Sequence, residues 1–224
     1  MVRSEGIKGG AAMKNTRVLE MLNEGRIDEL KAMLEDEIYS ESLKSNPVAK
    51  QRYAAMKRYF KYGAQVGKEA CKAPAKVGEY YSFCDGYSAV LTKESAGEIE
   101  LYNEAENGPY IDVMGMFKDR GEHIMVDFGE VFAQAKAKGY KLTKTVINSK
   151  SCVLKIKDHY FNLALVDKVV SILDDGEPME VIIRTNDPYT PITVISSIGK
   201  GLILPIKVTA ETNLSGTLFV EAAA

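Results

Sequence analysis

The stretch from Tyr160 to Val208 constrains the fold more than any other, because one apolar helical segment is followed there by three segments rich in β-branched residues. Asn162 is suited to cap the helix, whose apolar residues recur at helical spacing, and the Asp-Asp-Gly sequence at 174–176 is suited to end it. A turn is expected at 199–200, before the last strand. The predicted strands are 180–184, 191–196 and 201–208. This order predicts an antiparallel sheet backed by a helix.

Further β-structure and one further helix are expected upstream of this stretch. Residues 79–92 carry an Asp-Gly pair between two apolar-aromatic runs, which is a strong hairpin signal. Asp127 is suited to cap a helix over 128–138, with Glu130 as its capping-box partner. Short strands are expected at 99–102 and 110–116, and a strand pair at 144–148 and 152–157. The chain is therefore predicted to be an α+β protein.

The same patterns suggest how the chain is divided. Residues 1–13 read as a disordered leader, and residues 14–46 as a helical hairpin with a break near Gly25. Pro47 is suited to the first position of a third helix and opens the α+β domain. That domain is expected to span 47–209, with two or three helices behind its sheet, and 210–224 to form a tail.

Composition excludes several classes of protein. The 224 residues are 46% hydrophobic and 27% charged with a net charge of -2, so no global basic excess calls for nucleic acid. No apolar run approaches the ~18 residues needed to span a bilayer, and no signal-peptide pattern is present. A cytoplasmic protein without a membrane partner is expected. Cys71, Cys84 and Cys152 show no disulfide or zinc spacing.

Charge is unevenly distributed between two neighbouring segments. Residues 17–42 hold eight acidic and three basic side chains, net -5, whereas residues 44–76 hold nine basic and one acidic, net +8. The basic side chains alternate with aromatic ones, a mix that could lie against a phosphate backbone. The alternative is a solvated face neutralised by the acidic segment. The candidate DNA-binding residues are Lys50, Arg52, Lys57, Arg58, Lys61 and Lys68.

No constellation in the sequence demands an enzyme. An enzyme that uses Asp85 with His123 or His159 is kept as an alternative, because a hairpin tip can present catalytic side chains. Otherwise no catalytic residue, metal site or cofactor is expected.

Four short motifs, taken in order along the chain, resemble the bacterial DNA polymerase III β subunit, the sliding clamp. Residues 84–89, Cys-Asp-Gly-Tyr-Ser-Ala, are similar to its T-D-G-H-R-L hairpin, and Tyr160-Phe161-Asn162 with Leu165 and Val166 to its F-N-x-x-Y-L-L motif. Residues 191–194 resemble its P-x-x-I strand, and residues 204–208, Leu-Pro-Ile-Lys-Val, its M-P-V-R-L terminus. A further resemblance, over roughly 52–208, is to short clamp-like proteins of Gram-positive mobile elements and phages.

The resemblance implies a peptide-binding pocket between the hairpin and the terminal strand. In the clamp family these two segments capture short peptides of polymerases and repair proteins, and a strand edge with a proline-fixed rim suits an apolar anchor. Ser88, Cys84 and Lys207 replace the Arg, Thr and Arg of the family motifs. The pocket residues that the resemblance implies are Gly86, Tyr87, Ser88, Ala89, Leu204, Pro205 and Ile206.

The sequence therefore predicts a noncatalytic, clamp-like binding module in DNA replication or mobile-element maintenance. Its expected partners are replication or repair proteins that carry clamp-binding peptides, while non-sequence-specific contact with double-stranded DNA and homo-oligomerisation stay open. Clamp protomers carry three domains of this type, so one copy of 224 residues is too short to close a ring. The alternative is a structural or regulatory interaction protein that has lost clamp activity.

Overall fold

The computed structural model describes residues 16–63, 69–94, 96–97, 99–117, 120–140, 152–184, 187–209, 214 and 216–220. The chain separates into two compact units, Met1–Asn46 and Pro47–Ala224. The two units are described separately below.

Helices make up the described part of the first unit. Residues 16–23 are largely helical, and α2 spans Ile27–Ser45, beginning with two acidic residues that suit a helix N-terminus. Within the unit Met21 and Leu30 are buried. Several other large apolar side chains of the two helices are exposed, namely Leu19, Leu22, Ile27, Leu34 and Ile38.

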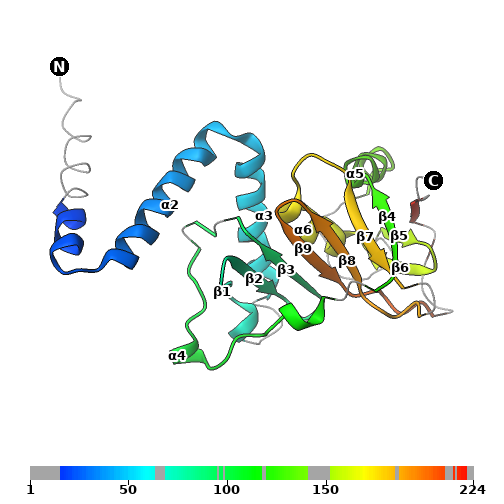
Figure 1. The fold of residues 1–224 in the computed structure, drawn as a ribbon. Coiled ribbons are helices and arrows are strands. Elements are labelled where there is room, and N and C mark those ends of the chain that lie inside the picture. The colour runs from blue at the N-terminus through cyan, green and yellow to red at the C-terminus, as the bar shows by residue number, and fades with distance from the viewer. Residues whose placement is uncertain are drawn as a thin grey trace, which may run out of the picture. The chain divides into compact units, whose positions relative to one another are not determined.

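A seven-stranded sheet dominates the second unit, with the strand order β1-β2-β3-β9-β8-β7-β4 (Figure 1). Every neighbouring pair in it is antiparallel. Because β3 pairs with β9, the hairpin and the C-terminal strand lie side by side although they are far apart in the chain. The strands are β1 (Ala75–Val77), β2 (Tyr80–Cys84), β3 (Ser88–Thr92), β4 (Glu122–Val126), β7 (Met179–Ile183), β8 (Ile192–Ser196) and β9 (Gly199–Ile203).

The predicted hairpin and the three strands predicted after the apolar helix are confirmed, although the bounds of β9 differ from those expected. The turn before β9 lies at 197–198 rather than 199–200, and the strand ends at Ile203 rather than at 208. Gly199 lies inside the sheet, opposite Thr92 of β3. A Cβ at this position would lie 2.1 Å from the Leu91 carbonyl oxygen, so a side chain would not fit there. The ladder stops near Pro205, which has no N–H to donate. Strands β1 and β4 were not predicted.

Helix α6 (Leu163–Leu173) forms the centre of the second unit. The Asn162 side chain caps it as predicted, accepting the Ala164 N–H at 2.9 Å. It contacts β3, β8 and β9 of the large sheet, β6 of the small one and helix α3 (Pro47–Gly63), so apolar residues occur all round it. A Cβ at Gly201 would lie 2.3 Å from Cγ1 of Val169, and glycine there lets α6 approach β9 closely.

Helices α3 and α5 also belong to the second unit. Aromatic rings of α3, Tyr59 and Phe60, pack on Phe83 of β2 with centroids 5.9 and 5.0 Å away. Helix α5 (Phe128–Ala137) begins as predicted, with the Asp127 side chain accepting the Glu130 N–H at 3.0 Å. The Glu130 side chain accepts instead from Gln134, one turn on.

A small sheet of three strands corrects the prediction that residues 210–224 form only a tail. Strand β5 (Val153–Ile156) pairs antiparallel with β6 (His159–Asn162) and parallel with β10 (Thr217–Val220). The expected tail therefore contains a strand, because burial of the apolar Leu218 in the core holds it there. The expected partner of β5, residues 144–148, lies outside the described residues.

The segment 93–121 contains short helices rather than the strands expected at 99–102 and 110–116. Helix α4 (Glu104–Asn107) forms because the Asn103 side chain caps it, and a 3-10 turn, η3, spans Met114–Met116. Another 3-10 turn, η2, spans Glu69–Cys71. Val113 is fully buried against the large sheet, so this segment covers part of the sheet face opposite α6.

The second unit is thus an α+β domain with a mainly antiparallel sheet, as the sequence predicts. Of the helices in the described part of the chain, none has the length and apolar character required to cross a bilayer.

Candidate functional site

The turn between β2 and β3 is organised by one carboxylate. Oδ1 of Asp85 accepts the backbone N–H groups of Tyr87 at 2.9 Å and Ser88 at 2.7 Å. It also accepts the Ser88 hydroxyl at 3.1 Å. Gly86 has φ +85°, a conformation that glycine adopts without strain. The turn is therefore rigid, and it leaves Tyr87 58% exposed at its tip.

A buried polar network lies beneath this turn. The Lys168 ammonium of α6 donates to Oδ2 of Asp85, and its Nζ lies 4.5 Å from the ring centroid of Tyr59. The Tyr59 hydroxyl donates to the Ser88 carbonyl oxygen at 2.8 Å. Burial, reinforced by the charge of Asp85, raises the pKa of Tyr59 well above its usual value, so its hydroxyl stays a donor.

All four side chains of this network are buried, which ties the hairpin tip to both α3 and α6. Lys168 was not predicted to be part of the site. Its signal was the presence of a single lysine in the mainly apolar helix 163–173, since a buried ammonium requires a partner.

The end of β9 continues past the hairpin tip. The Leu204 N–H donates to the Tyr87 carbonyl oxygen at 3.0 Å, one step beyond the Ser88–Ile203 pair. The Ile206 N–H then donates to the Tyr160 carbonyl oxygen at 2.7 Å, which carries the chain toward the small sheet. The structure therefore brings together the two segments that the sequence analysis assigned to one pocket.

The individual pocket residues differ in how accessible they are. Tyr87 is exposed, and Gly86 lies beside it on the surface. Leu204 and Pro205 are half-buried. The other three expected pocket residues, Ser88, Ala89 and Ile206, are buried.

A cavity of about 350 Å³ lies on the sheet face opposite α6. Its floor is set by strand register, because Ile182, Thr193 and Leu202 are directly opposite one another on β7, β8 and β9. Of the seven expected pocket residues, only Leu204 is among those that line it. The lining residues are Met116, Arg120, Ile182, Arg184, Thr190, Pro191, Thr193, Leu202 and Leu204.

The cavity borders a small second core on the same sheet face. Ala89, Leu91 and Leu202 are buried there under Val113 of the 93–121 segment, with Leu204 packed against the cluster. Alternation along the predicted strands could have identified the floor residues, because side chains two apart share a face. The contribution of Met116 and Arg120 had no local signal, since it depends on where an irregular segment folds back.

The basic residues of α3 divide into an accessible and a buried set. Lys50, Lys57 and Arg58 are exposed, and the Lys57 ammonium lies 4.4 Å from the ring centroid of Tyr53. A groove of about 420 Å³ is lined by Arg58 and neighbouring residues of α3 and α6. Among the other candidates, Lys68 and the side chain of Lys61 lie outside the described residues.

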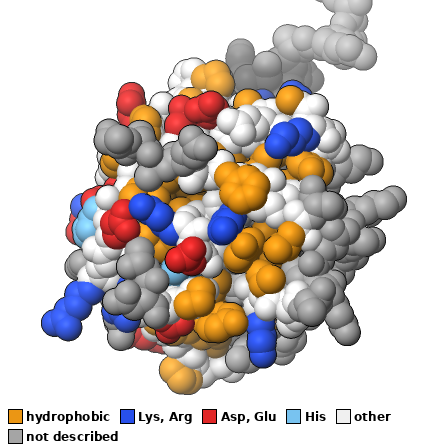
Figure 2. Space-filling model, turned by 90° about the vertical axis from the view of Figure 1, so that its right-hand side faces the viewer, with side chains coloured by type: hydrophobic (Ala, Val, Ile, Leu, Met, Phe, Trp, Pro, Cys, Tyr) orange, Lys and Arg blue, Asp and Glu red, His pale blue; other side chains and the backbone are white. Residues whose placement is uncertain are grey.

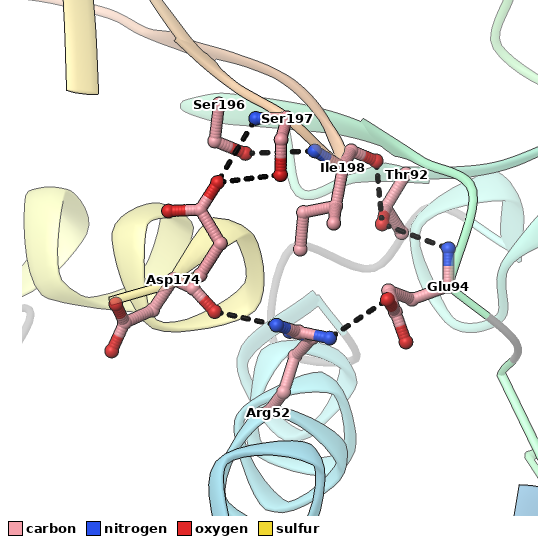
Figure 3. A network of polar contacts seen from close by, with 8 residues as sticks. Arg52, Thr92, Glu94, Asp174, Ser196, Ser197 and Ile198 are labelled. Atoms are coloured by element: carbon pink, nitrogen blue, oxygen red, sulfur yellow. Dashed lines mark hydrogen bonds and ion pairs between the residues drawn. The ribbon is translucent and has the colours of Figure 1, made fainter. Parts of the chain in front are cut away.

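Arg52 is buried and therefore unsuited to the phosphate contact predicted for it. Its Nη2 donates to the Asp174 carbonyl oxygen at 2.6 Å, and its Nη1 pairs with Oε1 of Glu94 at 2.9 Å (Figure 3). Nearby, the Ser197 N–H and hydroxyl donate to Asp175 at 3.0 and 2.7 Å. Arg52 thus joins α3 to the end of α6 and to the segment after β3.

The residues of the enzyme alternative have separate partners. Asp85 binds Lys168, whereas Nδ1 of His123 lies 2.7 Å from Oε1 of Glu180 on the neighbouring strand. Nε2 of His159 lies 2.9 Å from the Asp187 carbonyl oxygen. Over the described residues, no three His, Cys, Asp or Glu side chains are grouped so that they could hold a metal ion.

A second apolar area lies on the side of the domain that carries β4, β5 and β6. Figure 2 shows hydrophobic side chains gathered on this side, with charged side chains between them. Met125 and Phe219 are both exposed and both line a cavity of about 430 Å³ beside β4 and β10. The lining of this cavity also includes Asp127, Glu130 and Gln134, and it is more polar than the floor formed by β7, β8 and β9.

Comparisons with known proteins find weak likeness among solved structures. No protein-family model matches the chain, and no curated protein matches it. Among solved structures, the chain is similar to the DNA polymerase sliding clamp from Bacillus subtilis, with 13% sequence identity and a TM-score of 0.33. The match covers 58% of this chain and 41% of that clamp chain, so the chain spans less than half the length of the clamp.

Proposed function

We propose that this chain is a noncatalytic, clamp-like binding module that holds short peptide segments of replication or repair proteins. The observation that carries the proposal is the cavity of about 350 Å³ beside the joined hairpin and β9. Its floor is a strand surface that includes the apolar Ile182 and Leu202, and Leu204 adds a further apolar side chain to the lining. Such a site suits an extended peptide with one or two large apolar anchors.

The motif resemblance supplies the biological context of the proposal. Two of the clamp-like segments, the 84–89 hairpin and the 204–208 terminus, meet beside this cavity, which supports a role in DNA replication or mobile-element maintenance. The large sheet has two edge strands, β1 and β4. Encircling DNA would require several copies of the chain to assemble through such edges.

A peptide titration tests the binding proposal. A fluorescein-labelled peptide with the sequence Gln-Leu-Ser-Leu-Phe is titrated with the full chain, and anisotropy is recorded. Leu204→Ser should weaken binding by roughly tenfold, because it removes apolar contact from the cavity. Leu101→Ser is the matched control, since Leu101 is exposed and does not line the cavity. Absence of saturable binding by the unmodified chain would contradict the proposal and favour a structural interaction protein.

Non-sequence-specific contact with DNA through α3 is a second proposal, favoured by the exposure of Lys50, Lys57 and Arg58. Replacing both Lys57 and Arg58 with Glu should weaken retention of duplex DNA and reduce the dependence of binding on salt concentration. Lys155→Glu, on the small sheet, serves as a control for altered net charge. Unchanged retention in the α3 variant would remove DNA contact by this helix from the account.

A further inference from the structure

Two arginines lie at one end of the cavity floor. Arg184 directly follows β7 and Arg120 precedes β4, and these strands are antiparallel neighbours with Glu122 opposite Ile183. Nε of Arg184 donates to the Arg120 carbonyl oxygen at 3.2 Å, which fixes the Arg184 guanidinium relative to the start of β4. Both arginines line the cavity.

The acidic side chains on these two strands are engaged elsewhere. Glu122 pairs with the Lys157 ammonium at 2.7 Å, and Glu180 with Nδ1 of His123 at 2.7 Å. Across the described part of the chain, no carboxylate lies within ion-pair distance of Arg120 or Arg184. Two positive charges therefore border an apolar floor without a carboxylate from the described residues to offset them.

Guanidinium groups bind carboxylates through paired hydrogen bonds, and adjacent like charges favour an anionic ligand. The floor next to them is apolar at Ile182, Leu202 and Leu204. A peptide ligand that suits both features carries a large apolar side chain and, close to it in sequence, a carboxylate.

We infer that the cavity selects peptide segments in which an acidic residue flanks the apolar anchor, with Arg184 and Arg120 binding the carboxylate. This inference rests on the peptide-binding function proposed above. It assigns Arg184 and Arg120 to specificity, whereas the apolar floor provides the anchor site that any bound peptide uses.

The test compares acidic peptides with their uncharged isosteres. An aspartate is added to either end of a capped, labelled Gln-Leu-Ser-Leu-Phe peptide, and each product is paired with the asparagine version. At low salt one aspartate peptide should bind roughly tenfold more tightly than its asparagine counterpart. This difference in affinity should shrink at roughly 0.5 M salt, because interactions between exposed charges are screened at that concentration.

Variants of Arg184 test whether its guanidinium contributes to the effect. Arg184→Gln should reduce the preference for aspartate, and Arg184→Lys should retain more of it because the charge remains. Arg26→Gln, in the first unit, is the matched control. If aspartate and asparagine peptides bind equally well, the charge inference is wrong while peptide binding stands. If no peptide binds, the proposed function is wrong and the inference is wrong with it.

Discussion

At the scale of single residues, the hairpin tip depends on a buried charge pair. Asp85 and Lys168 are both almost completely buried, and Asp85 also holds the backbone of the turn. Removing two such charges from water is costly, so the pair is not by itself a large source of stability. The pair instead sets the position of the hairpin tip, because it attaches the turn that carries Tyr87 to α6.

Breaking this pair from one side should be strongly destabilising. Lys168→Met leaves the Asp85 carboxylate buried without its cationic partner, so the free energy of unfolding in urea should fall by about 3 to 5 kcal/mol. Adding Asp85→Asn to Lys168→Met should recover part of the loss, since no charge then stays buried. Equal stability of Lys168→Met and the unmodified chain would show that the pair does not form.

His159 gives the domain a dependence on pH that can be measured separately. Its ring is buried, and Nδ1 has no hydrogen-bond partner among the described residues. Burial lowers the pKa of His159, although its hydrogen bond to Asp187 and the charges of Asp158 and Asp187 oppose the shift. The unfolded chain therefore takes up a proton near pH 6.5, before the folded one does. Stability contributed by neutral His159 is present above about pH 6.5 and is lost as the pH falls below it.

A variant without the imidazole isolates this effect. Urea unfolding at about pH 7.5 and 5.5 should show a loss of stability at the lower pH that is smaller in His159→Phe. A pH dependence unaltered by His159→Phe would contradict the assignment.

At the scale of elements, the fold depends on how closely α6 approaches β9. Gly201 faces Val169 and Leu173 of the helix, and its missing side chain makes room for both. Gly199 and Gly201 lie in the stretch where a turn was predicted at 199–200, before a strand from 201. Their actual role is close packing inside the sheet.

Substitution of Gly201 should therefore be costly. A Cβ in Gly201→Ala would meet Cγ1 of Val169 at 2.3 Å, which requires α6 or β9 to shift, and stability should fall by about 1 to 3 kcal/mol. Gly115→Ala is the control, because nothing lies within 4 Å of a Cβ there. Thermal unfolding measures both, and equal effects of the two substitutions would contradict the packing account.

Local sequence signals predicted elements well where caps and turns define them. Asn162, Asp127 and the Asp85-Gly86 turn each act as expected, because their side chains bond to their own backbone neighbourhood. Edge strands β1 and β4 and the small-sheet strands β6 and β10 were missed. Their pairing partners are set by tertiary contacts, which short and weakly patterned segments do not encode locally.

At the scale of the whole molecule, the candidate site is built from segments that lie far apart in the sequence. The motif resemblance correctly joined the 84–89 hairpin to the 204–208 terminus, since β3 pairs with β9. It did not identify the cavity floor, because Ile182 and Thr193 become neighbours of Leu202 only through the β7-β8-β9 register. Arg52 illustrates the converse error, in which a basic residue on a basic helix is buried in a structural network.

Whether the cavity beside the hairpin and β9 binds peptides is tested by an NMR titration. The full chain, uniformly labelled with nitrogen-15, is titrated with the capped Gln-Leu-Ser-Leu-Phe peptide. We expect the largest amide shifts at Tyr87, Thr193, Leu202 and Leu204, around the cavity and the hairpin tip. Small shifts are expected at Phe219, on the small sheet. Shifts centred on Phe219, or no shifts at millimolar peptide, would contradict the claim that this cavity binds peptides.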